Sequence, residues 1–402
     1  MRIKIWGARG TTSAPERRNS RYGGNTPCVE VRLANGTLIV LDGGTGLRPL
    51  GNSLQREFGE RPVVGFVFLT HFHWDHIQGI PFFLPLYKAG NLFWFHSAGR
   101  SGLATQAAIE GQMTNPYFPV KMDVMQAAHH FFDLGCGSIN VNKAIITSRP
   151  LNHPQGCVGY RIQADGSTFV YATDTEPGSP DHDRSVRDLA QGADILVYDA
   201  QYTPEQLQHQ KKGWGHSSWL EGARIAQECG VKHLLLYHHD PANNDDDVDQ
   251  LVELARQQFP SVVGAAEGMR IDLYGGAVRW ANDGLAEDRR CARRLRVELP
   301  VYVRWRDLGG RQVETQGLTR DLSEGGIYFT APAELNTQQT MDLGLKLPEE
   351  IMPGTGLEVR YLAKPVRKEK FNEIPSSAGT AVGVAARFFN FPREAGKSGV
   401  AV

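Results

Sequence analysis

The most informative part of this chain is Thr70-His71-Phe72-His73-Trp74-Asp75-His76, which places three imidazoles and one carboxylate within six positions. It directly follows an apolar run at 63–69 that is typical of a buried strand. Side chains alternate along an extended segment, so the first two histidines can turn the same way, while the aspartate and the last histidine fall on the following turn. Imidazole nitrogens and carboxylate oxygens suit Zn²⁺, Fe and Mn. The stretch therefore predicts a site for two metal ions and one activated water.

This pattern resembles the HxHxDH signature of the metallo-β-lactamase superfamily, here His71, His73, Asp75 and His76. Later segments extend the resemblance over residues 1–282. It implies an α+β fold in which an αβ/βα sandwich carries the metals at one edge of its two sheets. The alternation of strand and helix patterns along this region agrees with a sandwich covered by helices.

The expected elements can be placed by their patterns. Apolar runs predict strands at, among others, 139–146, 195–198 and 233–237. Helical patterns lie at 47–59, 101–111, 183–191, 217–229 and 245–258. The last two helices begin after polar residues that can cap them, Ser217 and Asn244.

Three later segments at the ends of strands offer further metal ligands: Asn152-His153-Pro154, Thr173-Asp174-Thr175 and Tyr237-His238-His239. The resemblance implies that one ion is bound by three histidines, His71, His73 and His153. It implies that the other ion is bound by Asp75, His76 and His238, with Asp174 bridging the two. His238 is preferred because it comes first after the strand, and His239 stays open as the alternative.

Two more elements resemble the phosphodiesterase branch of the superfamily, such as RNase Z: Gly215-His216-Ser217-Ser218 and Tyr198-Asp199-Ala200. The resemblance implies a proton-shuttling pair, in which His216 protonates the leaving oxygen and Asp199 orients the imidazole. The branch commonly carries Glu where this chain has the shorter Asp199. Capping of the next helix is the alternative role for His216. Asp75, beside the metals, is the third catalytic candidate.

The reaction is hydrolysis, but the bond stays open at this point. Two cations about 3.5–4 Å apart activate water and neutralise developing charge, which serves a phosphodiester, an ester, a lactone, a thioester or a β-lactam. The fold does not choose among these bonds. The formal net charge is −1, and no long arm for transfer RNA is evident. A small phosphodiester or cyclic nucleotide is therefore favoured over structured nucleic acid.

A second domain follows a polar linker at 283–288. Short strands with turn signals fill 289–392, and 393–402 has the composition of a disordered tail. Arg289-Arg290-Cys291-Ala292-Arg293-Arg294 contains RxxxR, and Asp321-Leu322-Ser323-Glu324-Gly325-Gly326 fits DxSxxG. Together these motifs resemble the PilZ domain, which implies a small six-stranded β-barrel that binds cyclic di-GMP.

The chemistry of that ligand suits the motifs. Its two phosphates and two guanines match the planar donor fork of arginine, and a close backbone approach suits glycine. The resemblance assigns the binding of cyclic di-GMP to Arg289, Arg290, Arg293, Arg294, Asp321, Ser323 and Gly326.

Composition places the chain among cytoplasmic proteins. Its five cysteines are odd in number and widely spaced, which favours free thiols over a disulfide framework. The sequence has neither a signal-peptide pattern at its start nor an apolar run of about 18 residues. The favoured hypothesis is a two-metal phosphodiesterase, with Zn²⁺ preferred and Fe or Mn as alternatives, that cyclic di-GMP regulates.

Two other hypotheses stay open. One is a cyclic di-GMP effector or scaffold with little catalysis, and the other is a hydrolase of lactone, thioester or β-lactam bonds. A homo-oligomer or a signalling-protein partner is compatible with each of them.

Overall fold

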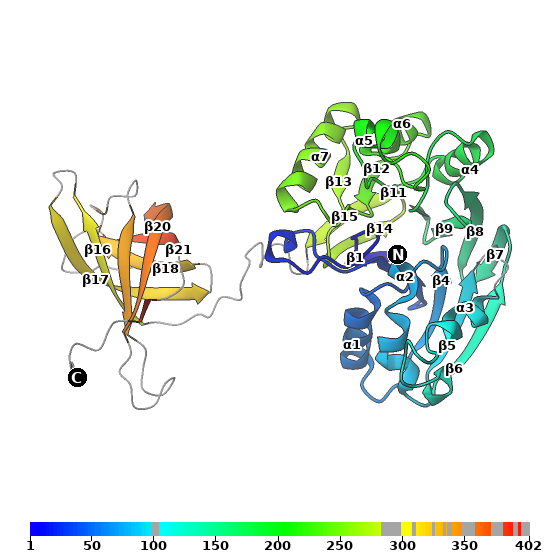
Figure 1. The fold of residues 1–402 in the computed structure, drawn as a ribbon, viewed down its shortest axis with the longest axis horizontal. Helices are drawn as coiled ribbons and strands as arrows, with labels where there is room; N and C mark the ends of the chain where they lie inside the picture. Colours follow the sequence, from blue (N-terminus) through cyan, green and yellow to red (C-terminus); the bar gives the residue numbers. More distant parts are fainter. Residues whose placement is uncertain are drawn as a thin grey trace. The chain divides into compact units, whose positions relative to one another are not determined.

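The structure is a computed structural model that describes residues 1–97, 104–282, 299–307, 311–323, 326–332, 335, 340–346, 358–370, 381–388 and 393–394. The chain forms two compact units, Met1–Glu287 and Asp288–Val402 (Figure 1). In the described ranges, no helix has the length and apolar character needed to cross a membrane.

The first unit contains an eight-stranded sheet in the order β15-β14-β1-β2-β3-β4-β5-β6. Strands β3 to β6 run parallel, and the pairs on the other side of β3 are antiparallel. The bounds are β1 Arg2–Gly7, β2 Cys28–Arg32, β3 Leu38–Leu41, β4 Val64–Leu69, β5 Leu92–Ser97, β6 Ala128–Asp133, β14 Met269–Tyr274 and β15 Ala277–Asn282.

A seven-stranded sheet faces it, in the order β13-β12-β11-β10-β9-β8-β7. Strands β10 to β13 run parallel, and β7 to β10 are antiparallel. The bounds are β7 Gly137–Val141, β8 Ala144–Leu151, β9 Cys157–Ala164, β10 Ser167–Ala172, β11 Ile195–Asp199, β12 His233–Tyr237 and β13 Val262–Gly264. The single strand predicted at 139–146 is therefore wrong: the chain turns there at Asn142, whose φ is 51°.

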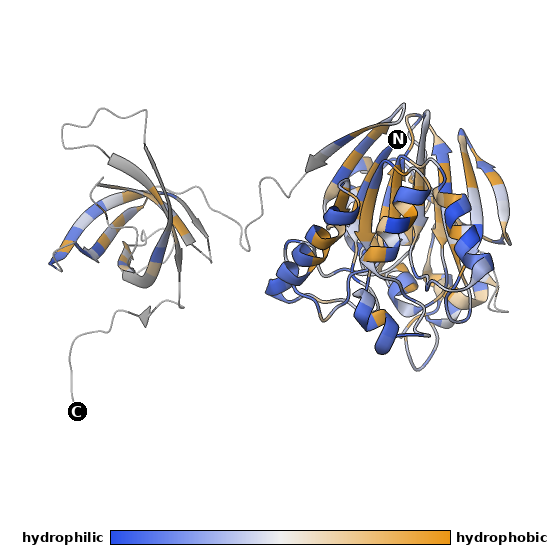
Figure 2. Cartoon of the chain, turned by 90° about the horizontal axis from the view of Figure 1, so that it is seen from above, coloured by the Kyte–Doolittle hydropathy of each residue, from blue (hydrophilic) through white to orange (hydrophobic). Residues whose placement is uncertain are grey.

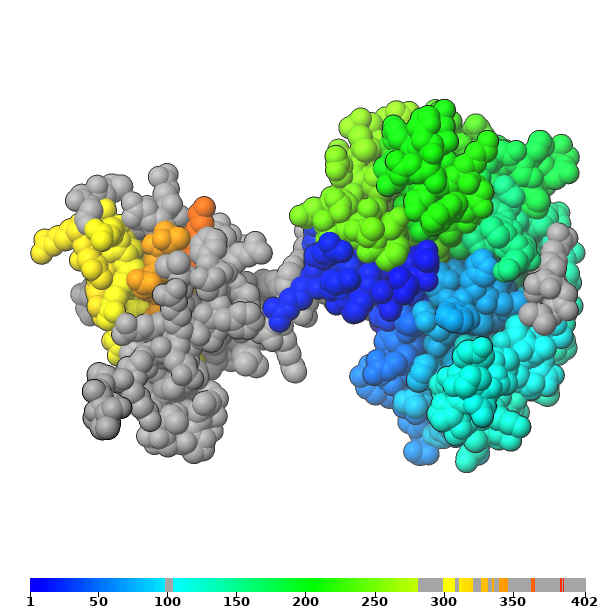
Figure 3. Space-filling model, viewed as in Figure 1, coloured from blue at the N-terminus to red at the C-terminus, as the bar shows by residue number. Residues whose placement is uncertain are grey.

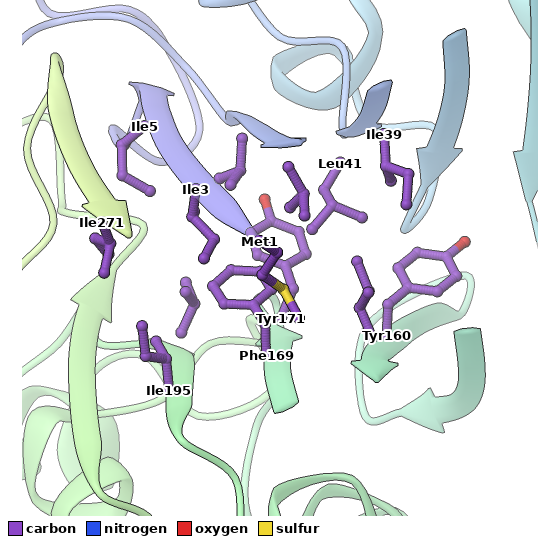
Figure 4. Packing of buried hydrophobic residues seen from close by; sticks show 14 of the residues in the cluster. Met1, Ile3, Ile5, Ile39, Leu41, Tyr160, Phe169, Tyr171, Ile195 and Ile271 are labelled. Atoms are coloured by element: carbon purple, nitrogen blue, oxygen red, sulfur yellow. The ribbon is translucent and has the colours of Figure 1, made fainter. Parts of the chain in front are cut away.

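The two sheets enclose the central core. Fully buried apolar side chains from both sheets pack against one another there, among them those of Ile3, Ile39, Phe169, Ile195 and Ile271 (Figure 4). Apolar colour follows the strands, and hydrophilic colour follows the outer helices (Figure 2). Removing this much apolar surface from water is the main driving force for the sandwich.

Helices cover the outer faces of both sheets (Figure 1). Two further apolar clusters lie beneath them, one under α1 and one under α4, α6 and α7. The helices are α1 Leu47–Phe58, α2 Trp74–Ile77, α3 Thr105–Gly111, α4 Pro180–Ala190, α5 Pro204–His209, α6 Trp219–Glu228 and α7 Asp245–Gln258. This layering confirms the predicted αβ/βα sandwich.

The predicted caps have different outcomes. Asn244 caps α7 and accepts hydrogen bonds from the amides of Asp246 and Asp247, as predicted. Ser217 is wrong as the cap of α6, because the neighbouring Ser218 accepts from the amide of Glu221. The buried Ser217 hydroxyl instead lies 3.0 Å from the hydroxyl of Tyr198 on β11.

The second unit is a β-barrel, as predicted. Its strand order is β19-β16-β17-β18-β21-β20-β22, and β19 also pairs with β20, which closes the ring of six longer strands. Val301, Val303, Phe329, Leu343 and Val384 fill its interior. The bounds are β16 Pro300–Arg306, β17 Gln312–Ser323, β18 Gly326–Pro332, β19 Met341–Lys346, β20 Glu358–Lys370, β21 Ala381–Phe388 and β22 Arg393–Glu394.

Some boundaries of this region fall outside the described residues, namely the linker 283–288 and the tail beyond Glu394. At Arg393–Glu394 the chain differs from the disordered tail that composition indicates, since β22 pairs there with Val359 and Arg360 of β20.

Candidate metal centre

The predicted site residues follow the ends of strands in both sheets. The histidine-rich stretch follows β4, His153 follows β8, Asp174 follows β10 and His238 follows β12, while Asp199 is the last residue of β11. Parallel strands that end at one edge bring their following loops together there, as in other open sheets. Residues more than a hundred positions apart thus meet at one place.

All seven predicted ligands lie in overlapping clusters whose ligand-type atoms are within 4.8 Å of one another. The first cluster contains His71, His73 and His153, and the second contains Asp75, His76 and His238. Asp174 lies between them: its Oδ1 is 3.8 Å from Nε2 of His153, and its Oδ2 is 3.3 Å from Nε2 of His76. The same Oδ1 is 3.4 Å from Nε2 of His238.

The two adjacent histidines after β12 point to different places. Nε2 of His238 lies 3.2 Å from Oδ2 of Asp75, inside the cluster. The ring of His239 is buried away from it, with Nε2 bonded to the carbonyl of Ala265 at 2.9 Å and an edge against Tyr22. The geometry thus favours His238 over His239 as a ligand.

Protein partners hold the nitrogen of each ring that faces away from the cluster. Nδ1 of His238 lies 2.9 Å from Oε1 of Gln201, and Nδ1 of His153 lies 2.8 Å from the carbonyl oxygen of Gly215. Such bonds fix the tautomer and turn the other nitrogen toward a metal. In His73 the two nitrogens exchange these roles. Its Nε2 contacts Oε1 of Gln155, and its Nδ1 faces the cluster, 3.0 Å from Nε2 of His153.

Two nitrogens of the cluster test whether metals fit here. Nε2 of His71 and Nε2 of His76 are buried and form no well-aligned hydrogen bond among the described residues, although carboxylate oxygens of Asp75 and Asp174 lie 3.2 Å and 3.3 Å from Nε2 of His76. A buried polar atom without a partner is costly, and bound cations would satisfy both nitrogens. The donor set of imidazoles and carboxylates fits Zn²⁺, Fe or Mn.

Asp42 supports the cluster from behind and was missed by the sequence reasoning. Its carboxylate accepts hydrogen bonds from the amide of Thr70 at 2.8 Å, from the hydroxyl of Tyr171 at 3.0 Å and from Nδ1 of His76 at 2.8 Å. The available signal was its position, directly after the buried strand β3 and before a Gly-Gly pair.

Three of these residues adopt left-handed backbone conformations: Asp42 at φ 60°, Asp174 at φ 57° and His238 at φ 59°. Residues other than glycine rarely do so, and such strain concentrates at functional sites. Each follows a strand end, where the sharp turn redirects its side chain toward the cluster.

The electrostatics of the cluster differ from ring to ring: burial opposes charge on His76, but the carboxylates of Asp75, Asp174 and Asp42 outweigh it and raise the pKa of His76 well above its usual value. Burial lowers the pKa of His71 well below its usual value and lowers the pKa of His153 to about 4. Burial alone would raise the pKa of Asp174, yet the imidazoles of His238 and His76 hold it well below the usual range. A cation binds neutral rings and an ionised carboxylate, so metal binding at His76 would displace a proton from that ring.

A hydrogen-bonded pair adjoins the cluster. Nδ1 of His216 lies 2.9 Å from Oδ2 of the fully buried Asp199 and 3.8 Å from Oδ1 of Asp174. The His216 ring stacks on that of His238, with centroids 4.9 Å apart. Burial opposes charge on His216, but Asp199 outweighs it and raises the pKa of His216 to about 9. The carboxylate of Asp199 thus favours the protonated ring, and Ser218, not His216, caps the helix.

The N-terminal segment, dark blue in Figure 3, forms surface between the green and lighter blue parts of the first unit. The amide of Thr11 donates to Oδ2 of Asp75 at 2.9 Å, and its hydroxyl accepts from Gln201 at 3.1 Å. This contact holds the carboxylate of Asp75 in the cluster.

The predicted cyclic di-GMP residues are only partly within the described ranges. Arg289, Arg290, Arg293 and Arg294 lie outside them. The backbones of Asp321 and Ser323 belong to β17, and Ser323 pairs with Gly326 where β18 begins.

Comparison with known families identifies both units. The family described as "Beta-lactamase superfamily domain" matches residues 37–239. The chain belongs to the metallo-β-lactamase superfamily. A second family, the PilZ domain, matches residues 287–394 of this superfamily member.

Curated relatives of this metallo-β-lactamase protein include ribonucleases Z. The enzyme of Porphyromonas gingivalis is 24% identical over 295 residues, covering 61% of this chain and 93% of that protein. That of Haloarcula marismortui is 26% identical over 324 residues, covering 67% and 96%. That of Brevibacillus brevis is 39% identical over 100 residues, which are 24% of this chain and 30% of that enzyme.

A solved structure shares the fold. Zn²⁺-bound PqqB from Methylobacterium extorquens superposes with a TM-score of 0.50 at 17% identity, over 68% of this chain and all of that one. The superfamily and its relatives make this protein a metal-dependent hydrolase with an RNase Z-like catalytic unit and a PilZ domain.

Proposed function

We propose that this protein is a two-metal phosphodiesterase that hydrolyses a small phosphodiester or cyclic nucleotide, and that cyclic di-GMP regulates it. The observation that carries the proposal is the pair of His216 and Asp199, whose 2.9 Å contact adjoins the metal cluster. Such a pair supplies a proton to a leaving alkoxide, which a phosphodiester releases. The ribonuclease Z relatives support the same class of bond.

The seven clustered residues are proposed to hold two ions, with His71, His73 and His153 at one and Asp75, His76 and His238 at the other. Asp174 lies close enough to both groups to serve each. Bound ions would activate water and neutralise charge on the phosphoryl oxygens. Zn²⁺ is favoured by the histidine-rich set, with Fe and Mn as alternatives.

The protein's own groups divide the remaining work. Asp199 accepts from Nδ1 of His216, which leaves Nε2 of that ring to carry the proton for the leaving oxygen. The buried negative charge of Asp199 stabilises the protonated ring. Asp75, held by the amide of Thr11, is proposed to receive the proton of the attacking water.

The barrel is proposed to bind cyclic di-GMP through Arg289, Arg290, Arg293, Arg294, Asp321, Ser323 and Gly326. The match to the PilZ domain supports this assignment. A chain that responds to this messenger works in the cytoplasm, and four free cysteines in the described ranges agree with a reducing compartment.

The role of His216 can be tested by changing the leaving group. In His216→Ala, kcat/KM for a dinucleoside monophosphate should fall by about 10²–10⁴, because its leaving alkoxide needs a proton. Hydrolysis of bis(p-nitrophenyl) phosphate should fall much less, because nitrophenolate departs without one. Metal content, measured by mass spectrometry, should stay unchanged.

His209→Ala, at an exposed position of α5, is the matched control and should behave as wild type. Equal losses on the two substrates would refute the acid role of His216. Lack of hydrolysis of either substrate by the metal-loaded wild-type protein would refute the phosphodiesterase proposal itself.

A further inference from the structure

The carboxylate of Glu176 holds the loop between α5 and α6 by hydrogen bonds to the backbone of that loop. Glu176, nearly buried and two residues after Asp174, accepts from the amide of Gly213 with both oxygens at 2.8 Å. It also accepts from the amide of Gly215 at 2.9 Å. The two amides that flank Trp214 are therefore fixed by the same side chain.

The pinned loop displays an aromatic ring. The side chain of Trp214 is 56% exposed although its neighbour Gly215 is buried. Nζ of Lys211 lies 3.8 Å from the centre of the Trp214 ring and 5.7 Å from that of Tyr202. In the part of the chain that the structure describes, no carboxylate pairs with Lys211, so its charge remains available.

The loop that carries Trp214 and Lys211 adjoins His153 of the candidate metal cluster and His216. The carbonyl of Gly215 holds His153 at 2.8 Å, and a Cβ atom at Gly215 would come within 2.4 Å of the same ring. His216 follows directly, and its ring contacts Tyr202 at a centroid distance of 5.8 Å. The loop thus carries an exposed indole, an unpaired cation and the proton donor within six positions.

A single exposed tryptophan is ordinary on a protein surface. Here, however, a nearly buried carboxylate fixes its backbone on both sides, and the ring is more than half exposed with a cation against it. Base–aromatic stacking tolerates any nucleobase, because every base has a π-face. A lysine beside the stack adds attraction for the phosphate that follows a base.

We propose that Trp214 and Lys211 form a subsite for the base-bearing side of the substrate, in which the base stacks on Trp214 and Lys211 attracts the phosphate. The inference rests on the proposed phosphodiesterase function and narrows its substrate to a nucleotide. Glu176 is the positioning residue of this subsite.

Binding tests the subsite without catalysis. Metal-loaded protein is titrated with thymidine 5′-monophosphate and with inorganic phosphate by calorimetry. Wild type should bind the nucleotide more tightly than phosphate. Trp214→Ala should lose about tenfold or more in nucleotide affinity and keep its phosphate affinity, while Trp214→Phe should retain most of the nucleotide affinity. Lys211→Ala should weaken both ligands, whereas the neighbouring Lys212→Ala should weaken neither.

Kinetics test the same subsite with two substrates that release the same leaving group, p-nitrophenolate. The p-nitrophenyl ester of thymidine 5′-monophosphate is compared with methyl p-nitrophenyl phosphate, which lacks the base. Trp214→Ala should lower kcat/KM about tenfold or more for the nucleoside ester alone.

Tyr274→Ala is the matched control for loss of an exposed ring. Tyr274 precedes a turn at which Gly276 bonds Ser167, the first residue of β10, at the sheet end opposite the metal cluster. Equal losses by Trp214→Ala on both esters, or equal affinity of wild type for nucleotide and phosphate, would overturn the subsite. If either of these outcomes overturned the subsite while wild type still hydrolysed both esters, the phosphodiesterase proposal would stand.

Discussion

Asp42 supports the candidate metal cluster from behind and is not one of the proposed ligands. Its buried carboxylate joins the backbone after β4, a tyrosine of the facing sheet and the ring of His76. A ligand oriented in this way binds metal more tightly than a free ring does, because its tautomer and direction are already set.

Replacing Asp42 should therefore weaken metal binding. Asparagine tolerates the left-handed backbone at this position, so Asp42→Asn should fold. It should lose about 10- to 100-fold in metal affinity, measured by competition with a chromophoric chelator. Asp188→Asn, on the exposed face of α4, should match wild type. Unchanged affinity in Asp42→Asn would show that His76 needs no such partner.

The buried ring of His96 predicts that the first unit loses stability in acid. Its ring stacks between Phe68 and Phe132, and neither nitrogen has a hydrogen-bond partner among the described residues. Burial lowers the pKa of His96 to about 4. Below about pH 6.5 this histidine is protonated in the unfolded chain but stays neutral in the folded chain. The free energy of unfolding therefore falls as the pH drops from about 6.5 toward 4.

This contribution can be isolated by substitution. Between pH 7 and pH 5, wild type should lose roughly 2 kcal/mol more unfolding free energy than His96→Phe, measured by urea denaturation. His130→Phe, at an exposed position of β6, should keep the wild-type pH dependence. Parallel pH curves for wild type and His96→Phe would contradict the assignment.

Among the elements, α6 begins shortly after His216 and packs near β11, the strand that ends at Asp199. Its cap lies one residue later than predicted, because Ser217 turns inward to the Tyr198 hydroxyl while Ser218 meets the helix amides. The sequence offers two adjacent serines with equal capping ability. Only the packing against β11 decides between them.

The cap at Ser218 should contribute to the stability of the protein. Ser218→Ala should lower the free energy of unfolding by about 1 kcal/mol, and Ser218→Thr should recover most of that loss because threonine also caps. Thermal and chemical denaturation would measure both variants. A Ser218→Ala protein as stable as wild type would argue against the cap.

Local sequence predicted β4, β11 and β12 beside the cluster, but it merged part of β8, which precedes His153, with β7, and it missed features that depend on distant contacts. Continuous apolar runs marked β4, β11 and β12, and the ligand motifs follow such runs directly. The edge strand β6, Ala128–Asp133, has no such run, because one of its sides is exposed. Gln201 and Glu176 acquire their roles only when loops separated in sequence meet.

For the whole molecule, regulation requires the messenger to bind two states of the catalytic unit unequally. Arg290→Ala should abolish cyclic di-GMP binding in calorimetry while metal content stays unchanged. Arg311→Ala, at an exposed position directly before β17, is the control within the same domain and should bind normally.

Saturating cyclic di-GMP should also change kcat or KM of wild type and leave Arg290→Ala unaffected. Binding with unaltered kinetics would leave the PilZ assignment in place and refute control of the hydrolase. Retained affinity in Arg290→Ala would refute the motif assignment.

The pairing of β1 with β14 has a consequence for synthesis. Ile3 lies opposite Ile271, so β1 must wait for one of the last strands of the hydrolase unit before this edge of β1 is covered. Contacts this distant in sequence form slowly. On the ribosome, an open β1 edge and an incomplete ligand set should coexist until His238 and β14 have emerged, which makes this interval the one in which a chaperone is most needed.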